Sequence, residues 1–290
     1  MFLKQLVNGV AVGSIYALIA LGYTMVYGIL KIINFAHGDI YMMGTFIGLT
    51  LIKVFHLGFS VSFLVSMVLT ALLGVLVERI AYRPLRSSDR WAPLLSALGV
   101  SILLANLAQL IWGTQTLPFP AGLKVSTYST AGLTISTLQL YILAISFLIM
   151  VGLYLFVQKT DIGVAMRATS HNIQVAQLMG IDTNRIISLT FAIGSALAAA
   201  AGILVGIYYD AVYPTMGYTA GLKAFTAAIM GGIGSIPGAM IGGLVLGIGE
   251  NFGAAYLSDS YRDAIAFGLL VLVLLTRPSG LFGRHVQQKV

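Results

Sequence analysis

Three polar side chains that could do chemistry, Asn34, His37 and Asp39, stand within six residues of each other between two long apolar runs. An ionisable side chain at the centre of a bilayer costs about 2.5–3.5 kcal/mol on insertion scales. Such groups therefore occur where water, a polar partner or the membrane surface is close. The cluster, with Gly38 opening the second run, predicts a pathway or gate for a solute. The alternative is an ordinary cytoplasmic turn in which Asn34 caps the next helix.

A second interruption has the same glycine-punctuated character. Residues 28–48 and 231–247 each join two apolar runs through a break. Paired interrupted segments in two halves of a chain are the best sequence pointer to a transport path. The alternative is two glycine-rich hairpins that only pack tightly. The residues of the second break that we assign to the same path or gate are Gly231, Gly232, Gly234, Ser235 and Pro237.

Glu250 is a carboxylate well inside a late apolar run. It is either a residue of the path or a polar anchor at the end of a tilted helix, and its position alone does not separate the two. Lys223 opens a short apolar run, and we expect its long side chain to reach the membrane interface.

The polar segment 159–185 is the longest of the basic segments. It predicts a short helix over 164–179 that Gly180 stops, followed by a span that Asp182 or Thr183 caps. Ile173, Ala176 and Leu178 form a small apolar face. Such a helix either docks into a groove on another protein or lies on lipid headgroups.

Several kinds of chemistry have no residues to carry them. The chain has no cysteine, four scattered histidines, and no phosphate-binding G-x-x-x-x-G-K-[S/T] motif or hydrolase motif. We therefore expect no enzyme activity, no bound metal and no cofactor in this chain. The net charge of +7 would suggest nucleic acid in a soluble protein, but the basic residues gather in short segments between apolar runs.

Composition places these residues in a membrane. Of the 290 residues, 58% are apolar and 9% are charged, against about 25% charged in soluble domains. Runs of the length that a bilayer requires predict an all-α, polytopic transmembrane bundle with eight or nine spans, including broken or half helices, in a single domain over 1–290. The runs lie near 6–30, 38–55, 59–79, 92–112, 138–158, 186–209, 221–234, 236–257 and 262–276.

Basic residues set the expected orientation. Residues 79–90, 159–185 and 277–290 are rich in arginine and lysine, so we place them in the cytoplasm. Residues 113–137 then face the other side, and Lys53 and Arg262 are exceptions outside. The N-terminus would be inside for eight spans and outside for nine.

Four strings are specific enough to indicate a family. They are residues 8–39, which end in INFAHGD, ERIAYRPLRSS at 78–88, residues 178–202, and residues 223–250, which contain GGIGSIPGA. Together they closely resemble the high-affinity branched-chain amino acid permeases, one of two membrane subunits of a bacterial ABC importer for leucine, isoleucine and valine.

The resemblance implies a set of partners. These are a second homologous permease, two cytoplasmic ATPases that bind the ATP, and a periplasmic substrate-binding protein, all around a multi-pass subunit of the bacterial inner membrane. It also implies an ATPase-coupling loop, although residues 165–170 read AMRATS where the broader importer signature begins E-A-A. The coupling residues are Gly163, Ala165, Arg167, Ala168, Leu178, Gly180 and Ile181.

Two alternatives stay open. Similar permeases carry urea or short amides. A self-sufficient secondary carrier or channel would instead use His37, Asp39 or Glu250 as an ion site.

Overall fold

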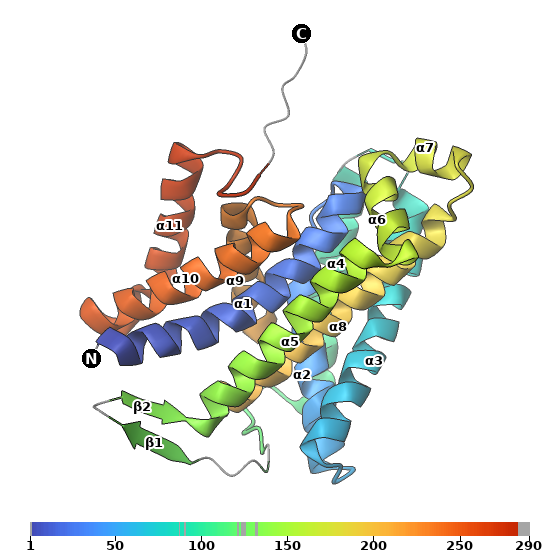
Figure 1. Cartoon of the computed structure of the whole chain (residues 1–290). Helices are drawn as coiled ribbons and strands as arrows, with labels where there is room; N and C mark the ends of the chain where they lie inside the picture. The colour runs from blue at the N-terminus through green and yellow to red at the C-terminus, as the bar shows by residue number, and fades with distance from the viewer. Residues whose placement is uncertain are drawn as a thin grey trace.

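A computed structural model describes residues 2–283 apart from 87, 90, 121, 123–125, 131 and 132. Within that part of the chain, nine helices have 15 or more residues, and two short helices, α6 (Asp161–His171) and α7 (Ile173–Leu178), join α5 to α8 (Figure 1). The nine are α1 (Phe2–Leu30), α2 (His37–Lys53), α3 (Phe59–Val77), α4 (Trp91–Trp112), α5 (Thr137–Lys159), α8 (Thr183–Tyr209), α9 (Met216–Gly231), α10 (Ile236–Tyr256) and α11 (Arg262–Thr276).

These helices correspond one by one to the nine predicted apolar runs. Five helices, α1, α3 with its extension to Leu85, α4, α5 and α8, are long and apolar enough to cross a membrane by themselves. The protein is therefore a helical, polytopic membrane protein. The seventh run differs most, because α9 begins at Met216 rather than near 221.

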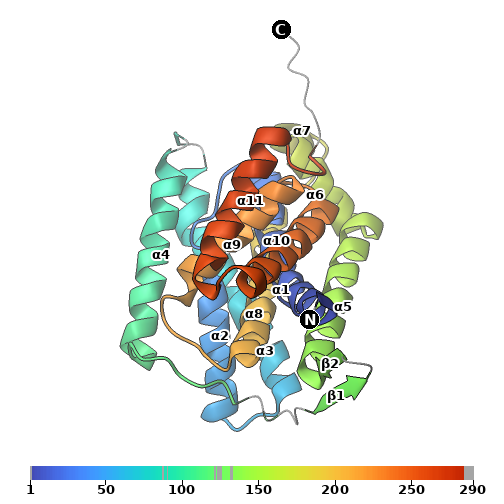
Figure 2. The same cartoon turned by 90° about the vertical axis from the view of Figure 1, so that its left-hand side faces the viewer.

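α1 and α8 occupy the centre of the bundle. In the most apolar stretch of α1, 94% of the residues are buried, against 17% in α4. In Figure 2, α4 and α5 lie at opposite edges of the molecule. The exposed side of α3 carries large apolar residues at four-residue spacing, which suits contact with lipid. They are Leu64, Val68, Leu72 and Leu76, and Ile80 continues the series in the turn beyond α3.

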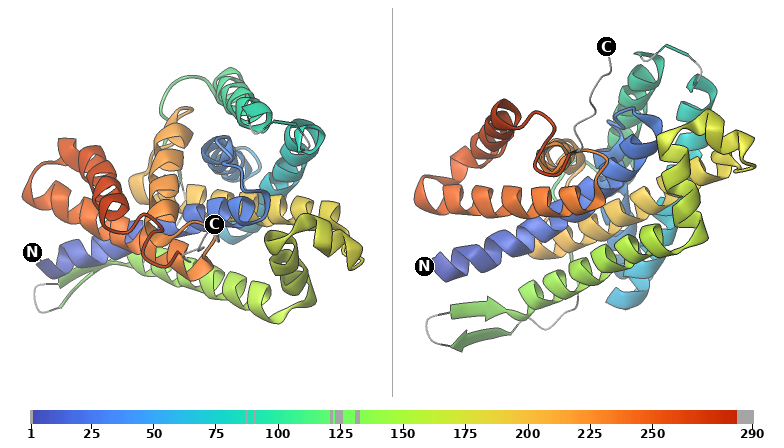
Figure 3. Two further views of the ribbon diagram at one scale, coloured as in Figure 1. Left: turned by 90° about the horizontal axis from the view of Figure 1, so that it is seen from above. Right: turned by 45° about the horizontal axis from the view of Figure 1, so that its top comes forward.

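Small residues let the central helices approach closely. The right-hand view of Figure 3 shows α10, α1, α8 and α5 side by side. A Cβ atom on Gly9 would lie 2.8 Å from the Cα of Ile248, and one on Gly13 would lie 2.9 Å from the Cα of Leu244. Between α2 and α8, a Cβ on Gly44 would lie 2.6 Å from the Cα of Ala199. Without a hydrophobic drive in lipid, this backbone proximity supplies van der Waals contact between helices.

The basic segments gather at one end of the bundle. α6, α7, the end of α3 and the end of α11 lie at the top of Figure 1. The opposite end carries an antiparallel hairpin that the all-α prediction lacked, formed by β1 (Thr127–Thr130) and β2 (Leu133–Ser136). α1 begins at that opposite end, where Asn8 accepts a hydrogen bond from Gln139 at the start of α5. Residues 284–290 of the predicted cytoplasmic tail lie outside the described part.

Beyond α3 the chain widens into a π-helical turn (Glu78–Tyr82) and then tightens into a 3₁₀ turn (Arg83–Leu85). A 3₁₀ turn (Asp259–Tyr261) also precedes α11. The two 3₁₀ turns sit next to helix ends, where such turns are common.

Candidate functional site

The break between α1 and α2 folds back into the protein. Asn34 is buried, and its Oδ1 accepts hydrogen bonds from the backbone N–H of Ala36 (3.1 Å) and the hydroxyl of Tyr82 (2.8 Å). The proposed capping role of Asn34 is wrong, since Ala36 precedes α2 and no side chain caps that helix. Asn34 instead fixes the break against the π-helical turn that follows α3.

His37 and Asp39 lie in the first turn of α2, and both are buried. The His37 ring contacts Tyr23 edge-on with ring centroids 4.6 Å apart, and its Nε2 has no hydrogen-bond partner among the described residues. Asp39 Oδ2 accepts a hydrogen bond from the hydroxyl of Ser101 at 2.5 Å. A turn on the cytoplasmic surface would leave these groups in water, so the burial argues against that alternative.

The first turn of α2 meets the first turns of α9. A Cβ atom on Gly38 would overlap the carbonyl oxygen of Gly217, and one on Gly221 would lie 3.1 Å from the Cα of Gly38. Helix N-termini carry partial positive charge, which favours a carboxylate such as Asp39 near this junction. Sequence reasoning missed Gly217 and Gly221. Their four-residue spacing before an apolar run was a signal that could have found them.

The second break, 232–235, lies elsewhere. It is a tight turn in which Gly232 and Gly234 have φ of +101° and +95°, and Ser235 Oγ caps α10 by accepting the Gly238 N–H. Pro237 sits in the first turn of α10. Segment 277–283 covers the turn, since Phe282 N–H donates to the carbonyl of Gly231 at 3.0 Å. The structure therefore brings the start of α9, and not this break, to His37, Gly38 and Asp39.

Glu250 is the centre of a buried charge network. Its Oε1 pairs with Lys223 Nζ at 2.8 Å, and its Oε2 accepts a hydrogen bond from the hydroxyl of Tyr16 at 2.9 Å. Lys223 also pairs with Asp263 at 2.8 Å. The Lys223 side chain, which we expected to reach the membrane interface, is 13% exposed and pairs with two carboxylates. Because these residues belong to α9, α10, α1 and α11, the network joins four helices.

A polar hollow lies beside this network, where α8 and α10 end. Its volume is about 280 Å³, and Arg262 in its wall pairs with Asp259 at 2.8 Å. It is lined by Gln5, Asn8, Tyr208, Tyr209, Asn251, Ala254, Ala255, Asp259 and Arg262.

The predicted coupling helix is two helices. Asn172 is extended (φ −158°, ψ 115°) and its side chain caps α7 by accepting the Val175 N–H at 3.1 Å. The single helix predicted over 164–179 is therefore wrong, because a short polar side chain favours a cap over a helix interior at this position.

α6 is mounted rigidly on the end of α5. Gly163 is buried, and a Cβ atom there would overlap the carbonyl oxygen of Val157. The guanidinium of Arg167 donates a hydrogen bond to the same carbonyl. Ala165 and Ala168 are half-buried on this helix.

α7 ends in a left-handed glycine turn. Gly180 has φ of +83°; its N–H donates to the carbonyl of Gln177, and the Ile181 N–H donates to that of Ala176, each at 3.0 Å. This Schellman pattern confirms Gly180 as the helix stop, and Asp182 caps α8 as predicted. Of the three residues of the predicted apolar face, Leu178 is exposed, Ile173 is half-buried and Ala176 is buried.

Two apolar side chains at the end of this segment are almost fully exposed. Leu178 is 87% exposed and Met179 is 77% exposed. Large apolar groups this exposed at the basic end of the bundle indicate a contact surface.

A second buried ion pair lies beyond the end of α3. Glu78 is fully buried, pairs with Arg86 and accepts a hydrogen bond from Ser188 Oγ at 2.6 Å. Arg86 also donates to Asn184 Oδ1 at 2.9 Å. These contacts hold the chain beyond α3 against the start of α8, directly after the α6–α7 segment.

Comparison with known proteins identifies the family of the chain. The family model described as "Branched-chain amino acid transport system / permease component" matches residues 5–274. The chain belongs to this family. It is a family of transport permeases.

Full-length relatives agree. The chain is 48% identical to the high-affinity branched-chain amino acid transport system permease protein BraD of Pseudomonas aeruginosa, covering 100% of this chain and 98% of that protein. It is 46% identical to LivH of Escherichia coli K12, of the same description, with the same coverage. A probable branched-chain amino acid permease, LivH of Methanocaldococcus jannaschii, is 31% identical over 97% of this chain and 92% of that protein.

Proposed function

We propose that this chain is a permease subunit of an ABC importer that moves branched-chain amino acids across the bacterial inner membrane. The observation that carries the proposal is the identity of 45–48% over the whole chain to permeases named for that transport. The subunit itself does no chemistry, and ATP is bound and hydrolysed by two cytoplasmic ATPase subunits.

The α6–α7 segment is the contact with an ATPase in this proposal. Leu178 and Met179 offer an apolar tip, and Gly163 and Arg167 hold α6 against the end of α5. A rigid mount is what force transmission requires, since a loose loop would absorb the motion. A helix that only rested on lipid would not need this attachment.

The solute path in this proposal runs past the starts of α2 and α9. His37 and Asp39 supply the polar groups there, and the glycines beside them supply room for backbone movement. A second, homologous permease supplies the other half of the path, and a periplasmic binding protein delivers the amino acid.

The 280 Å³ hollow at the opposite end from α6–α7 is the place where the released amino acid first meets this chain. Its amide groups, with Arg262 and Asp259, suit the carboxylate and ammonium groups that every amino acid carries. Urea and short amides lack both charges.

The rival proposal, a self-sufficient carrier with an ion site at Glu250, is weakened by one contact. Lys223 neutralises Glu250 at 2.8 Å, so a cation entering there would have to displace an ammonium group.

The test is purification of the tagged chain from its native host, followed by identification of what accompanies it. Two ATPases and a second permease support the proposal. A chain that purifies alone, and that moves solute in liposomes with only an ion gradient, contradicts it.

A further inference from the structure

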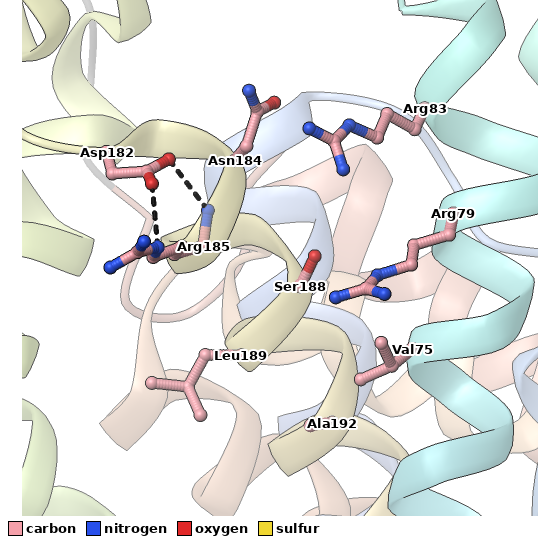
Figure 4. A pocket seen from close by; sticks show the side chains of 9 residues that line it. All are labelled: Val75, Arg79, Arg83, Asp182, Asn184, Arg185, Ser188, Leu189 and Ala192. Carbon is pink, nitrogen blue, oxygen red and sulfur yellow. Dashed lines mark hydrogen bonds and ion pairs between the residues drawn. The ribbon is translucent and has the colours of Figure 1, made fainter.

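A second hollow lies at the basic end, between the end of α3 and the start of α8, as Figure 4 shows. Its volume is about 490 Å³. None of the residues that line it belongs to the Glu250 network or to the solute path proposed above. It is lined by Val75, Arg79, Arg83, Asp182, Asn184, Arg185, Ser188, Leu189 and Ala192.

Two arginines dominate its polar half. Arg79 and Arg83 are four residues apart and point together toward Asn184 and Ser188 (Figure 4). Neither makes an ion pair or a side-chain hydrogen bond within the described part of the chain. Like charges at this spacing repel each other, so an anion between them would relieve the repulsion.

The nearby acidic groups are already used. Asp182 pairs with Arg185 at 2.9 Å on the far side of the hollow (Figure 4). Glu78 is buried and pairs with Arg86. The hollow therefore keeps the two positive charges of Arg79 and Arg83. The Oδ1 of Asn184 is taken by Arg86, which leaves its amide N–H groups to donate to a ligand.

The other half of the hollow is apolar. Val75, Leu189 and Ala192 lie deeper along α3 and α8, away from the arginines (Figure 4). Val75 is half-buried and directly precedes Leu76, which belongs to the exposed apolar stripe of α3. A cationic end joined to an apolar groove beside the lipid-facing side of α3 fits an amphiphile better than a small soluble anion.

We propose that this hollow binds the phosphate headgroup of an anionic lipid, with an acyl chain along Val75, Leu189 and Ala192. Basic pockets between helices on the cytoplasmic side of a membrane recognise such headgroups. The lipid would brace the end of α3 against α8, next to the α6–α7 segment.

The test is a lipid titration of the purified full chain in detergent, followed by native mass spectrometry. The probes are dioleoylphosphatidylglycerol, dioleoylphosphatidylcholine and inorganic phosphate. We compare the wild type with Arg79→Gln/Arg83→Gln, and with Lys159→Gln as a control that removes an exposed charge at the same end of the bundle. Elution volume and thermal stability without lipid check that each variant is folded.

We expect the phosphatidylglycerol Kd of the double variant to be about 25-fold higher, since each arginine at an anionic surface contributes roughly fivefold. The control should bind as the wild type does, and phosphatidylcholine should bind weakly to all three. Equal binding of both lipids, or no effect of the double variant, overturns the proposal. Release of the lipid by millimolar phosphate would make this a soluble-anion site. Protection of Arg79→Cys from labelling by an ATPase subunit, and not by phosphatidylglycerol, would make it a protein contact. Either result also overturns it.

Discussion

A Cβ atom on Gly217 would lie 2.6 Å from the carbonyl oxygen of Gly38, so neither residue leaves room for a side chain. The two glycines hold the start of α9 against the start of α2, beside His37 and Asp39. This junction is the point where the two halves of the chain meet around buried polar groups.

Gly217→Ala should disrupt this junction. Forcing a methyl group into a packed site costs about 1–3 kcal/mol, and we expect uptake to fall further than stability because the junction lies on the proposed path. The measurements are thermal unfolding in detergent and uptake of labelled leucine. Gly99→Ala in α4 is the matched control, since nothing lies within 4 Å of a Cβ there. Equal stability and equal uptake in the two variants would show that the close approach of Gly217 to Gly38 is not needed for transport.

Glu250→Gln should destabilise the protein by about 3 kcal/mol, the low end for breaking a buried ion pair, because Lys223 keeps Asp263 as a partner. Asp263→Asn should cost less than about 1 kcal/mol, since Asp263 is 62% exposed. Unfolding free energies in mixed micelles measure both. A double-mutant cycle with Lys223→Met and Glu250→Met isolates the pair. A coupling energy near zero would contradict the network.

His37→Leu and Asp39→Ala should lower uptake more than they lower the amount of protein in the membrane. Both groups are buried where the starts of α2 and α9 meet, and removing either changes the polarity of the proposed path. Ser101→Ala, which removes only the hydrogen-bond partner of Asp39, should have a smaller effect. Leucine uptake normalised to inserted protein is the measurement. Wild-type uptake by both His37→Leu and Asp39→Ala would show that these two residues serve only in packing.

Leu178→Asp should uncouple ATP hydrolysis from uptake, because a charge replaces the apolar tip that we place on the ATPase. Ala168→Trp should do the same, since Ala168 is half-buried and its helix must shift. Gln174→Ser, an exposed change on the same segment, is the control. The measurement is ATPase activity of the reconstituted complex with and without loaded binding protein. If Leu178→Asp preserves the stimulation, α6–α7 is not the coupling element.

The helices could be predicted from the sequence because a membrane span is a matter of length and hydropathy. Each of the nine runs became a helix, and the polar cluster at 34–39 stood out because ionisable groups are rare within or directly beside apolar spans. The break at Asn172 could not be predicted in the same way. A cap and a helix interior differ there by a single side-chain hydrogen bond.

Contacts between segments that are far apart in the chain also could not be predicted from the sequence. Lys223 and Glu250 are 27 residues apart, and only the turn between α9 and α10 brings them together. Gly38 contacts Gly217 because α2 and α9 begin side by side. No pattern in either local sequence predicts that contact. The Glu78–Arg86 pair lies within one segment, but its burial depends on α8, which supplies Ser188.

The central claim, ATP-driven import of branched-chain amino acids, is tested most directly by uptake into proteoliposomes. The complex purified through this chain is reconstituted with binding protein outside and ATP inside, and labelled leucine is followed over time. We predict uptake that requires enclosed ATP, is blocked by excess unlabelled isoleucine or valine, and is insensitive to urea. Uptake that proceeds without ATP under an ion gradient, or that urea blocks and valine does not, would contradict the account.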